Sequence, residues 1–385
     1  MSNFWQDTIT AARHFRQELH RYPELGWEET RTAKRIRDLL TELKIPWEPC
    51  AETGTLARLN PDSSGKHIAL RGDIDALPIE EENDCDWRSH HGGCMHACGH
   101  DGHTATLYAA ARWLKHCEAT LPGPVTLVFQ PAEEGLHGAR EMIRQGALEG
   151  IDEIYGWHNW PAIPFGQLAC PDGIVMCGNG TFTLTFEGRG GHASQPELCA
   201  DPVLAASATH LALQQIVARR LPPQSAAVVS VTSIEAPSSP TVIPQKAVMG
   251  GSIRVPDRQT REKINHLIGD IARSTANSYG VECAVDIQPR YEATINHPDA
   301  AGRVRNLWRD EFGDDGLNAT LPVPIMASED FSYYLQEIPG AFALVGADDG
   351  DNHHAPCHSP HYDFNDRLIP LVTRLYARLA GTPAP

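Results

Sequence analysis

Two patterns associated with membranes, a long apolar run and a signal peptide, are not recognisable in the sequence. No stretch approaches the ~18–20 consecutive apolar residues of a membrane-spanning helix. The first residues, Met1 to Asp7, do not combine a basic segment with an apolar one, so we predict no signal peptide. Ten cysteines in a chain without an export signal indicate reduced thiols rather than a disulfide framework. We therefore expect a cytoplasmic protein with no membrane partner.

Positive charge is also scarce. The chain has 32 Lys and Arg against 49 Asp and Glu, which gives a net charge of -17 at pH 7. Nucleic acids and anionic membranes bind basic surfaces, so we expect neither as a partner. Hydrophobic residues nevertheless make up 41% of the 385 residues, which is enough for a sizeable core. A chain of this length favours two domains over one.

The outer parts of the chain have the pattern of an α/β sheet. Residues 1–45 are predicted to be helical around a loop at 21–26, and buried strands are predicted at 67–70, 125–129 and 151–157. Each strand is followed by polar residues: Asp75 after the first, Glu133 and Glu134 after the second, and His158 after the third. Polar residues at strand ends, with helices between the strands, are typical of a site at the carboxyl edge of a sheet.

The middle of the chain has a different order of elements. Strands are predicted at 181–186, 226–234, 247–255 and 281–287, and helices at 201–219 and 260–279. This β-α-β-β-α-β order is the ferredoxin-like pattern, which forms a complete small domain. A strand at 342–345 and a helix at 366–379 then resume the α/β pattern. We therefore predict an inserted ferredoxin-like α+β domain at 179–292, within an α/β domain formed by 1–178 and 293–385 that has a mixed sheet flanked by helices.

The run Met95–His103 carries a thiol, three imidazoles and a carboxylate. Its glycines allow a tight turn, so Cys98 and His100 could converge on one point. Thiolate and imidazole ligands suit zinc, cobalt and nickel, and added carboxylates suit manganese. A helical pattern starts at His103, which fits packing or capping as well as metal binding. Asp101 could hydrogen-bond a metal ligand, or it could be a carboxylate at the helix start, where the helix dipole favours negative charge.

Further candidate ligands lie elsewhere in the outer domain. Glu133 and Glu134 are adjacent, His158 follows the next strand, and His358 lies near the C-terminus. Neighbouring side chains of an extended segment point in opposite directions, so one carboxylate can bind metal while the other contacts a water. Metal binding would lower the pKa of that water to about 7. The second carboxylate could then take its proton.

These motifs together resemble the metallopeptidase M20 family. The similarity is to its amidohydrolase branch, which contains aminoacylases, hippurate hydrolases and plant auxin-conjugate hydrolases. The motifs occur in order along nearly the whole chain: His20–Leu25, Leu70–Pro78, Met95–His103, Phe129–Gly135, Gly190–Ser194, Ser328–Phe331 and His358–Asp366.

The resemblance implies a dinuclear metal site. Cys98 would bridge two divalent ions, and His100, Glu134, His158 and His358 would complete their ligands. The ions could be manganese, zinc, cobalt or nickel, and the sequence does not distinguish among them.

The resemblance also implies catalytic roles. Glu133 would act as the general base and then protonate the leaving amine, and Asp75 would orient a ligand imidazole. His192, from the inserted lid domain, would stabilise the oxyanion in its own or a neighbouring subunit's site. Arg254 would bind the substrate carboxylate through its bidentate fork. Thr241 stands where the family usually has a substrate-contacting Asn, and its single hydroxyl changes the contacts available there.

The implied reaction is the hydrolysis of the amide bond of a small N-acyl amino acid. N-acetyl and N-benzoyl amino acids both fit, and so does an N-acetyl diamino acid such as N2-acetyl-diaminobutyrate in ectoine degradation or N-acetyl-diaminopimelate. Alternatives are a dipeptidase or carboxypeptidase of the same fold, a thiol enzyme that uses Cys98, and a non-catalytic small-molecule binding protein. An open sheet edge in the inserted domain would be a natural surface for a homodimer.

Overall fold

The chain forms two compact units, and the computed structural model describes residues 3–385. Unit 1 contains Met1–Val175, Ile295–Val323 and Asp330–Pro385, and unit 2 contains Met176–Thr294 and Pro324–Glu329. Residues 324–329 were predicted to belong to the outer domain, because this segment has no periodic pattern of its own. It groups with unit 2, where Ile325 forms a β-bridge with Met176.

Unit 1 is built on a seven-stranded sheet in the order β1-β2-β4-β3-β5-β15-β6. The inner strands β4, β3, β5 and β15 are parallel, whereas β1, β2 and β6 pair antiparallel toward the edges. The predicted α/β class with a mixed sheet is therefore confirmed. The strands are β1 (Trp47–Cys50), β2 (Gly54–Leu59), β3 (Ile68–Asp73), β4 (Val125–Gln130), β5 (Glu153–Pro164), β6 (Leu168–Ala169) and β15 (Gly340–Asp348).

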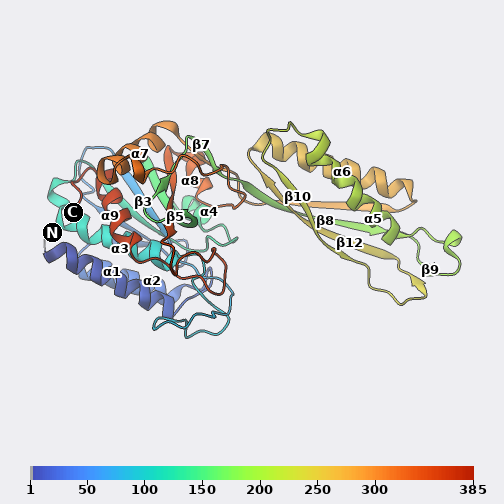
Figure 1. Ribbon diagram of the computed structural model, residues 1–385, viewed down its shortest axis with the longest axis horizontal. Coiled ribbons are helices and arrows are strands. Elements are labelled where there is room, and N and C mark those ends of the chain that lie inside the picture. The colour runs from blue at the N-terminus through green and yellow to red at the C-terminus, as the bar shows by residue number, and fades with distance from the viewer. Residues whose placement is uncertain (1–2) are drawn as a thin grey trace. The chain divides into compact units, whose positions relative to one another are not determined.

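Helices cover both faces of this sheet (Figure 1). Helix α3 packs on β3 and β4 between α1 and α9, whereas α4 and α8 pack together, α4 against β4 and α8 against β15. The sequence-predicted stripe of the first helix (Trp5, Ile9, Ala12, Phe15, Leu19) is buried as expected. The helices are α1 (Asn3–Arg21), α2 (Thr30–Glu42), α3 (His100–His116), α4 (Gly138–Arg144), α7 (Pro298–Phe312), α8 (Ser332–Glu337) and α9 (Leu368–Leu379). Within residues 3–385, no helix is both long and apolar enough to span a bilayer.

The β1–β2 hairpin was not predicted. Three of the four β1 residues are exposed, so the strand lacks the apolar alternation that signals a half-buried strand. Its turn contains Ala51 and Glu52, both at positive φ, rather than the glycine that usually marks such a position. A local pattern is therefore missing in both the strand and the turn.

Two glycines explain the sharp start of α3. Gly99 lies just before the helix at φ 90°, where a Cβ would come 2.2 Å from Asn159 Oδ1. At Gly102 a Cβ would lie 2.3 Å from the Phe364 ring. The first glycine supplies the left-handed turn and the second the close packing. Cys98 and His100 are thereby held on either side of a tight turn, as the sequence analysis expected.

Unit 2 contains a four-stranded antiparallel sheet in the order β10-β12-β8-β13, with α5 and α6 packed against it. Its sequence order is β8, α5, β10, β12, α6, β13, which is the predicted β-α-β-β-α-β pattern. The predicted helix at 201–219 ends early, at Leu213, and a π-helical turn follows. The elements are β8 (Gly178–Glu187), β9 (Gly191–His192), α5 (Pro202–Leu213), the π turn (Ile216–Arg220), β10 (Val228–Glu235), β11 (Val242–Ile243), β12 (Lys246–Val255), α6 (Arg258–Ser278) and β13 (Glu282–Pro289). The short strands β7 (Gly173–Met176) and β14 (Thr294–Asn296) form a separate two-stranded sheet.

Candidate metal centre

The candidate ligands of unit 1 gather where its parallel strands end. Asp75 follows β3, and Glu133 and Glu134 follow β4. His158 lies within β5, which extends to Pro164 rather than ending near residue 157 as predicted. However, β5 pairs with β3 only as far as Tyr155. His158 therefore lies beyond the end of this pairing, near the carboxyl end of β3. The parallel register therefore brings these side chains to one edge.

Two of the groups of three side chains that could hold a cation share Cys98. Cys98, His100 and His158 place one donor atom each within 4.8 Å of one another, and so do Cys98, Glu134 and His358. Cys98 belongs to both groups, and its Sγ lies 3.3 Å from His158 Nε2. All five sequence-predicted ligands thus come together, with the thiol at the shared position. This is the arrangement that two ions sharing one ligand require.

Two of the imidazoles, His100 and His158, are oriented by a hydrogen bond at Nδ1, as the imidazole ligands of metals usually are. His100 Nδ1 lies 3.1 Å from Asp75 Oδ1, so it donates to that carboxylate, and His100 Nε2 is buried without a hydrogen-bond partner among residues 3–385. His158 Nδ1 donates to the Asn159 carbonyl at 2.6 Å, which leaves Nε2 directed at Cys98. A carboxylate or carbonyl behind a ligand imidazole fixes its orientation and tautomer. The donor set therefore fits a divalent cation.

His358 completes the second group from the C-terminal part of the chain. Its Nε2 lies 3.0 Å from Glu134 Oε1, and its backbone N–H donates to the Ala97 carbonyl at 2.7 Å. The residue has φ 68°, a left-handed conformation that a non-glycine residue rarely adopts. Tertiary contacts thus impose this conformation and place His358 beside the Cys98 turn.

The charges at this edge shift the pKa values of the donors. Burial alone would raise the pKa of Glu134, but its hydrogen bond with His358 and the charge of His100 lower the pKa below its usual value. Burial and the neighbouring His103 hold the pKa of His158 well below its usual range, so this imidazole is neutral. The hydrogen bond with Cys357, followed by burial, raises the pKa of Cys98. A cation bound by Cys98 would have to displace its proton, as thiolate ligation requires.

Glu133 lies beside the second group. Its carboxylate, with His100 and Glu134, forms another set of donors within 4.8 Å, and its Oε1 accepts the Asp330 N–H at 3.2 Å. Asp75 Oδ2 accepts the Glu134 N–H at 2.9 Å, so Asp75 contacts both His100 and this loop. The two adjacent glutamates are thus held separately, with Glu134 toward His358 and Glu133 toward Asp330.

A buried ionic network under the centre was missed by sequence reasoning. Asp73 binds Arg71 Nη1 at 2.6 Å and His103 Nδ1 at 2.7 Å, and Arg71 also contacts Asp330. Burial would raise the pKa of Asp73, but Arg71, His100 and His103 hold it well below its usual range. His103 packs and pairs here, 2.8 Å from Asn159 Oδ1, and also forms a donor group with Asp73 and His100. The run Arg71-Gly72-Asp73 could have predicted this network, because it places two opposite charges at the end of a buried strand.

A second buried cluster explains Asp101. Its carboxylate lies 2.8 Å from His20 Nδ1 and 3.6 Å from Arg16 Nη1, and all three side chains are almost fully buried. Burial would lower the pKa of His20, but Asp101 raises it to about 9. Asp101 therefore lies in the first turn of α3, as one of the two expectations had it, and is also an ion-pair partner of α1. The i, i+4 spacing of Arg16 and His20 on the buried side of α1 could have indicated this.

The remaining predicted residues lie in unit 2. His192, in β9, is exposed, and its Nδ1 lies 3.1 Å from the Ser194 backbone N. Because Nδ1 accepts this N–H, the neutral ring carries its proton on Nε2. Thr241 is exposed, and its carbonyl accepts the Ala193 N–H at 2.9 Å. Arg254 is half-buried in β12, and burial lowers its pKa; among residues 3–385 no carboxylate acts on its charge.

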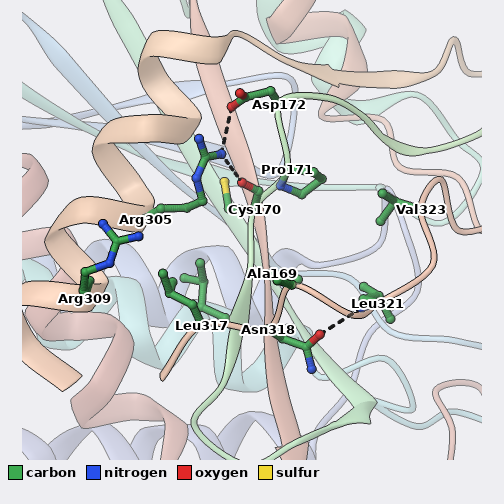
Figure 2. Close-up of a pocket in the computed structure, with 12 residues that line it drawn as sticks. Ala169, Cys170, Pro171, Asp172, Arg305, Arg309, Leu317, Asn318, Leu321 and Val323 are labelled. Atoms are coloured by element: carbon green, nitrogen blue, oxygen red, sulfur yellow. Dashed lines mark hydrogen bonds and ion pairs between the residues drawn. The ribbon is translucent and has the colours of Figure 1, made fainter. Parts of the chain in front are cut away.

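A depression elsewhere on unit 1 contains none of these residues (Figure 2). It has a volume of about 360 Å³ and lies between the β6 segment and α7. Arg305 at its rim already donates to the Cys170 carbonyl at 2.6 Å and to Asp172 at 2.8 Å, and Arg309 pairs with Asp314. Burial raises the pKa of Cys170 to about 12, so this thiol is not a reactive one. The centre at the sheet edge is therefore the stronger functional candidate.

An α/β sheet that gathers thiol, imidazole and carboxylate donors at its carboxyl edge defines a candidate metalloenzyme. The model of Peptidase family M20/M25/M40 matches residues 69–382, and the chain belongs to this family. The predicted family resemblance is thereby confirmed.

Individual relatives place the chain in the amidohydrolase branch. It is 39% identical to the N-acetyl-L-cysteine deacetylase of Bacillus subtilis over 88% of this chain and 81% of the relative. It is 37% identical to the IAA-amino acid hydrolase ILR1-like 2 of Arabidopsis thaliana over 95% of this chain and 83% of the relative. The crystal structure of the Bacillus subtilis YXEP protein, described as a dinuclear metal-binding peptidase from the M20 family, has a TM-score of 0.85 and 30% identity, and covers 97% of this chain and 98% of that one.

Proposed function

We propose that this enzyme hydrolyses the amide bond of a small N-acyl amino acid at a dinuclear metal centre. The observation that carries the proposal is the pair of donor groups that share Cys98, with the Glu133 carboxylate beside them. Similarity to an N-acetyl-L-cysteine deacetylase and an IAA-amino acid hydrolase supports the reaction class. Because the names of these relatives differ in the acyl group, N-acetyl and bulkier acyl groups both remain in the proposed range.

Five side chains would hold the two divalent ions. Cys98 would be shared, His100 and His158 would complete one ion's ligands, and Glu134 and His358 the other's. Manganese, zinc, cobalt and nickel all fit a mixed set of thiolate, imidazole and carboxylate. When bound, the ions supply Lewis-acid activation of the acyl carbonyl and of a water molecule.

The protein's own groups would then move the proton. Glu133 would accept a proton from the attacking water and deliver it to the leaving amine nitrogen. The Asp330 N–H holds Glu133 Oε1, and Asp75 holds both the His100 ring and the Glu134 backbone. These contacts keep the general base and the ligands in fixed orientations, which general acid–base catalysis requires.

Three residues of unit 2 would bind the substrate. His192 would donate from Nε2 to the developing oxyanion, in its own or a partner subunit's site, because its Nδ1 is occupied by the Ser194 N–H. Arg254 has no carboxylate acting on its charge among residues 3–385, which fits a guanidinium that binds the substrate carboxylate. Thr241 would contact the substrate through its hydroxyl. In this proposal unit 2 (predicted as 179–292) acts as a lid.

A homodimer through unit 2 is part of this proposal. Leu204 and Leu211, seven residues apart on α5, are 53% and 73% exposed, and Ile234 on β10 is 44% exposed. Strand β10 is at the edge of its sheet, and α5 packs against it. An apolar helix face beside an open strand edge is a self-complementary surface of the kind that two-fold dimers use. Ten free thiols fit a reducing compartment, so we place the enzyme in the cytoplasm.

A substrate and metal screen tests the function. Purified protein is loaded separately with Mn²⁺, Zn²⁺, Co²⁺ or Ni²⁺ and assayed on N-acetyl, N-benzoyl and N-acetyl diamino acids and on dipeptides. We expect release of free amino acid from N-acyl amino acids, and a loss of ~10²–10⁴-fold in kcat in Glu133→Gln with metal content unchanged. Preferential cleavage of dipeptides would instead indicate a peptidase. Full activity after exhaustive chelation, or in Glu133→Gln with its metal bound, would overturn the proposal.

A further inference from the structure

Glu29 is a buried carboxylate to which the proposed mechanism assigns no role. Its side chain is 0% exposed, although it stands at the N-cap position of α2, where a carboxylate would normally face solvent and accept helix N–H groups. No such capping bond is formed. Something other than the helix start therefore keeps this side chain in the interior.

Its two oxygens are used by distant parts of unit 1. Glu29 Oε1 accepts the Ala132 N–H at 2.9 Å, and Oε2 accepts the Thr53 hydroxyl at 2.7 Å. Ala132 directly precedes Glu133 and follows Pro131, which has no N–H. The Ala132 amide is thus the first N–H of the loop that carries both glutamates, and Glu29 binds it.

Ala132 has an unusual backbone conformation. It is fully buried with φ 53°, in the left-handed region that an alanine rarely adopts. Its carbonyl accepts the Gly138 N–H at 3.0 Å, which closes the loop on itself. A strained residue persists only where its surroundings hold it. The Glu29 carboxylate and the Gly138 amide are the polar groups that do so here.

Other carboxylates hold the same loop further along. Asp75 Oδ2 accepts the Glu134 N–H at 2.9 Å, and Asp330 Oδ2 accepts the Ala139 N–H at 2.9 Å. Glu29, Asp75 and Asp330 therefore bind three successive parts of the loop. Asp75 and Asp330 also contact ligand or base residues, whereas the hydrogen bond of Glu29 to this loop is to the Ala132 backbone.

We propose that Glu29 is a positioning residue for the general base: by binding the Ala132 N–H it holds this residue at positive φ and so directs the Glu133 and Glu134 side chains. The inference rests on the proposed hydrolase function. Its physical basis is that a small displacement of a catalytic group can reduce the rate by ~10²-fold. Gln can replace Glu29 in this role, since its amide oxygen accepts the Ala132 N–H and its NH₂ can donate to the Thr53 hydroxyl.

The kinetic test compares four variants of the metal-loaded enzyme. We expect Glu29→Ala to lower kcat by ~10–100-fold with KM within about twofold and metal content unchanged. Glu29→Gln should retain kcat, and so should Thr53→Val, which removes the other partner of Glu29 but leaves the Ala132 bond. Glu29→Ala/Ala132→Gly should regain part of kcat, because glycine adopts positive φ without help. A purely structural Glu29 would give equal losses of kcat in Glu29→Ala and Thr53→Val and no rescue by glycine, and either result would overturn the proposal.

A second measurement does not depend on turnover. Hydrogen–deuterium exchange of peptides covering 131–139 should be faster in Glu29→Ala than in wild type or Thr53→Val. If the wild type hydrolyses no N-acyl amino acid but this exchange difference is present, the proposed function fails while the loop contact stands. If the wild type is active and exchange of this loop is unchanged in Glu29→Ala, the positioning role fails alone.

Discussion

The two units use their sheets in opposite ways. The inner strands of unit 1 are parallel and end at one edge, so polar residues after β3 and β4 and within β5 meet there. In unit 2 the neighbouring strands are antiparallel, so their ends alternate between the two sides of the sheet. Its candidate residues are correspondingly separate: His192 on a short strand, Arg254 within β12.

This difference extends to burial and pairing. Cys98, His100 and Asp75 are almost fully buried and touch one another or shared partners, whereas His192 is exposed, with its ring on Ser194 and its backbone paired with Val242 of β11. Substitutions at the edge of unit 1 should therefore affect stability together with activity. Substitutions at the exposed positions of unit 2 should affect activity or assembly alone. The following experiments test that contrast.

The largest effect is expected at Arg71, beneath the metal centre. Arg71→Ala would leave Asp73 and Asp330 buried without their guanidinium. Removing one partner of a buried ion pair typically costs ~3–5 kcal/mol, so we expect this loss in the free energy of unfolding, measured by urea denaturation. Arg144→Ala, at a side chain that is 72% exposed, is the matched control and should change little. Equal free energies of unfolding for the two variants would contradict the expectation that substitutions at the buried edge of unit 1 reduce stability.

His192 should behave in the opposite way. His192→Ala is expected to lower kcat by ~10²–10³-fold, as loss of an oxyanion donor does, while the free energy of unfolding stays within ~0.5 kcal/mol. His266→Ala, an exposed histidine on α6, controls for the loss of an imidazole from unit 2. Mixing His192→Ala with Glu133→Gln protomers would restore activity only if His192 acts across a dimer. A large loss of stability in His192→Ala would show that the residue is structural.

A smaller, pH-dependent effect is expected at Glu29. Burial and the charge of Asp75 raise its pKa from 4.5 to about 7. Because the folded state holds this proton more tightly, the contribution to stability is complete below pH 4.5 and declines as the pH rises toward 7. Glu29→Gln does not titrate, so its stability relative to wild type should increase by about 2–3 kcal/mol over this range.

Thermal or urea unfolding at several pH values measures this difference. Glu42→Gln, at a side chain that is 69% exposed, should show no such slope and serves as the control. A parallel pH dependence in wild type and Glu29→Gln would mean that Glu29 is ionised in the folded protein at neutral pH.

The smallest effect is expected on assembly through unit 2. Leu211→Arg should raise the dimer dissociation constant by tenfold or more, since each buried leucine contributes about 1.5–3 kcal/mol. Light scattering over a dilution series measures this, and protomer unfolding at low concentration should not change. Leu198→Arg, at another exposed leucine of unit 2, is the control. A wild-type monomer at all concentrations would remove the proposed dimer.

Local sequence patterns predicted many of the helices and strands correctly. The helical stripe of α1, the buried strands β3 and β4, and the β-α-β-β-α-β order of unit 2 were all predicted from periodicity. The β1–β2 hairpin was missed because its exposed residues carry no period. The end of β5 was placed too early because the continuous apolar run ends at Trp157 and prolines follow at 161 and 164, while pairing with β15 continues to Pro164.

The donors available to the chain, and their order, can be predicted from local patterns, because residue type, glycine spacing and apolar period are local properties. Which donors meet depends on the folded chain: Cys98 in both groups, Asp73 with His103, and Glu29 on Ala132. These contacts join residues far apart in the chain, and no local pattern encodes them. The metal-ligand contacts among them follow from the parallel register of the sheet, which brings separate strand ends to one edge.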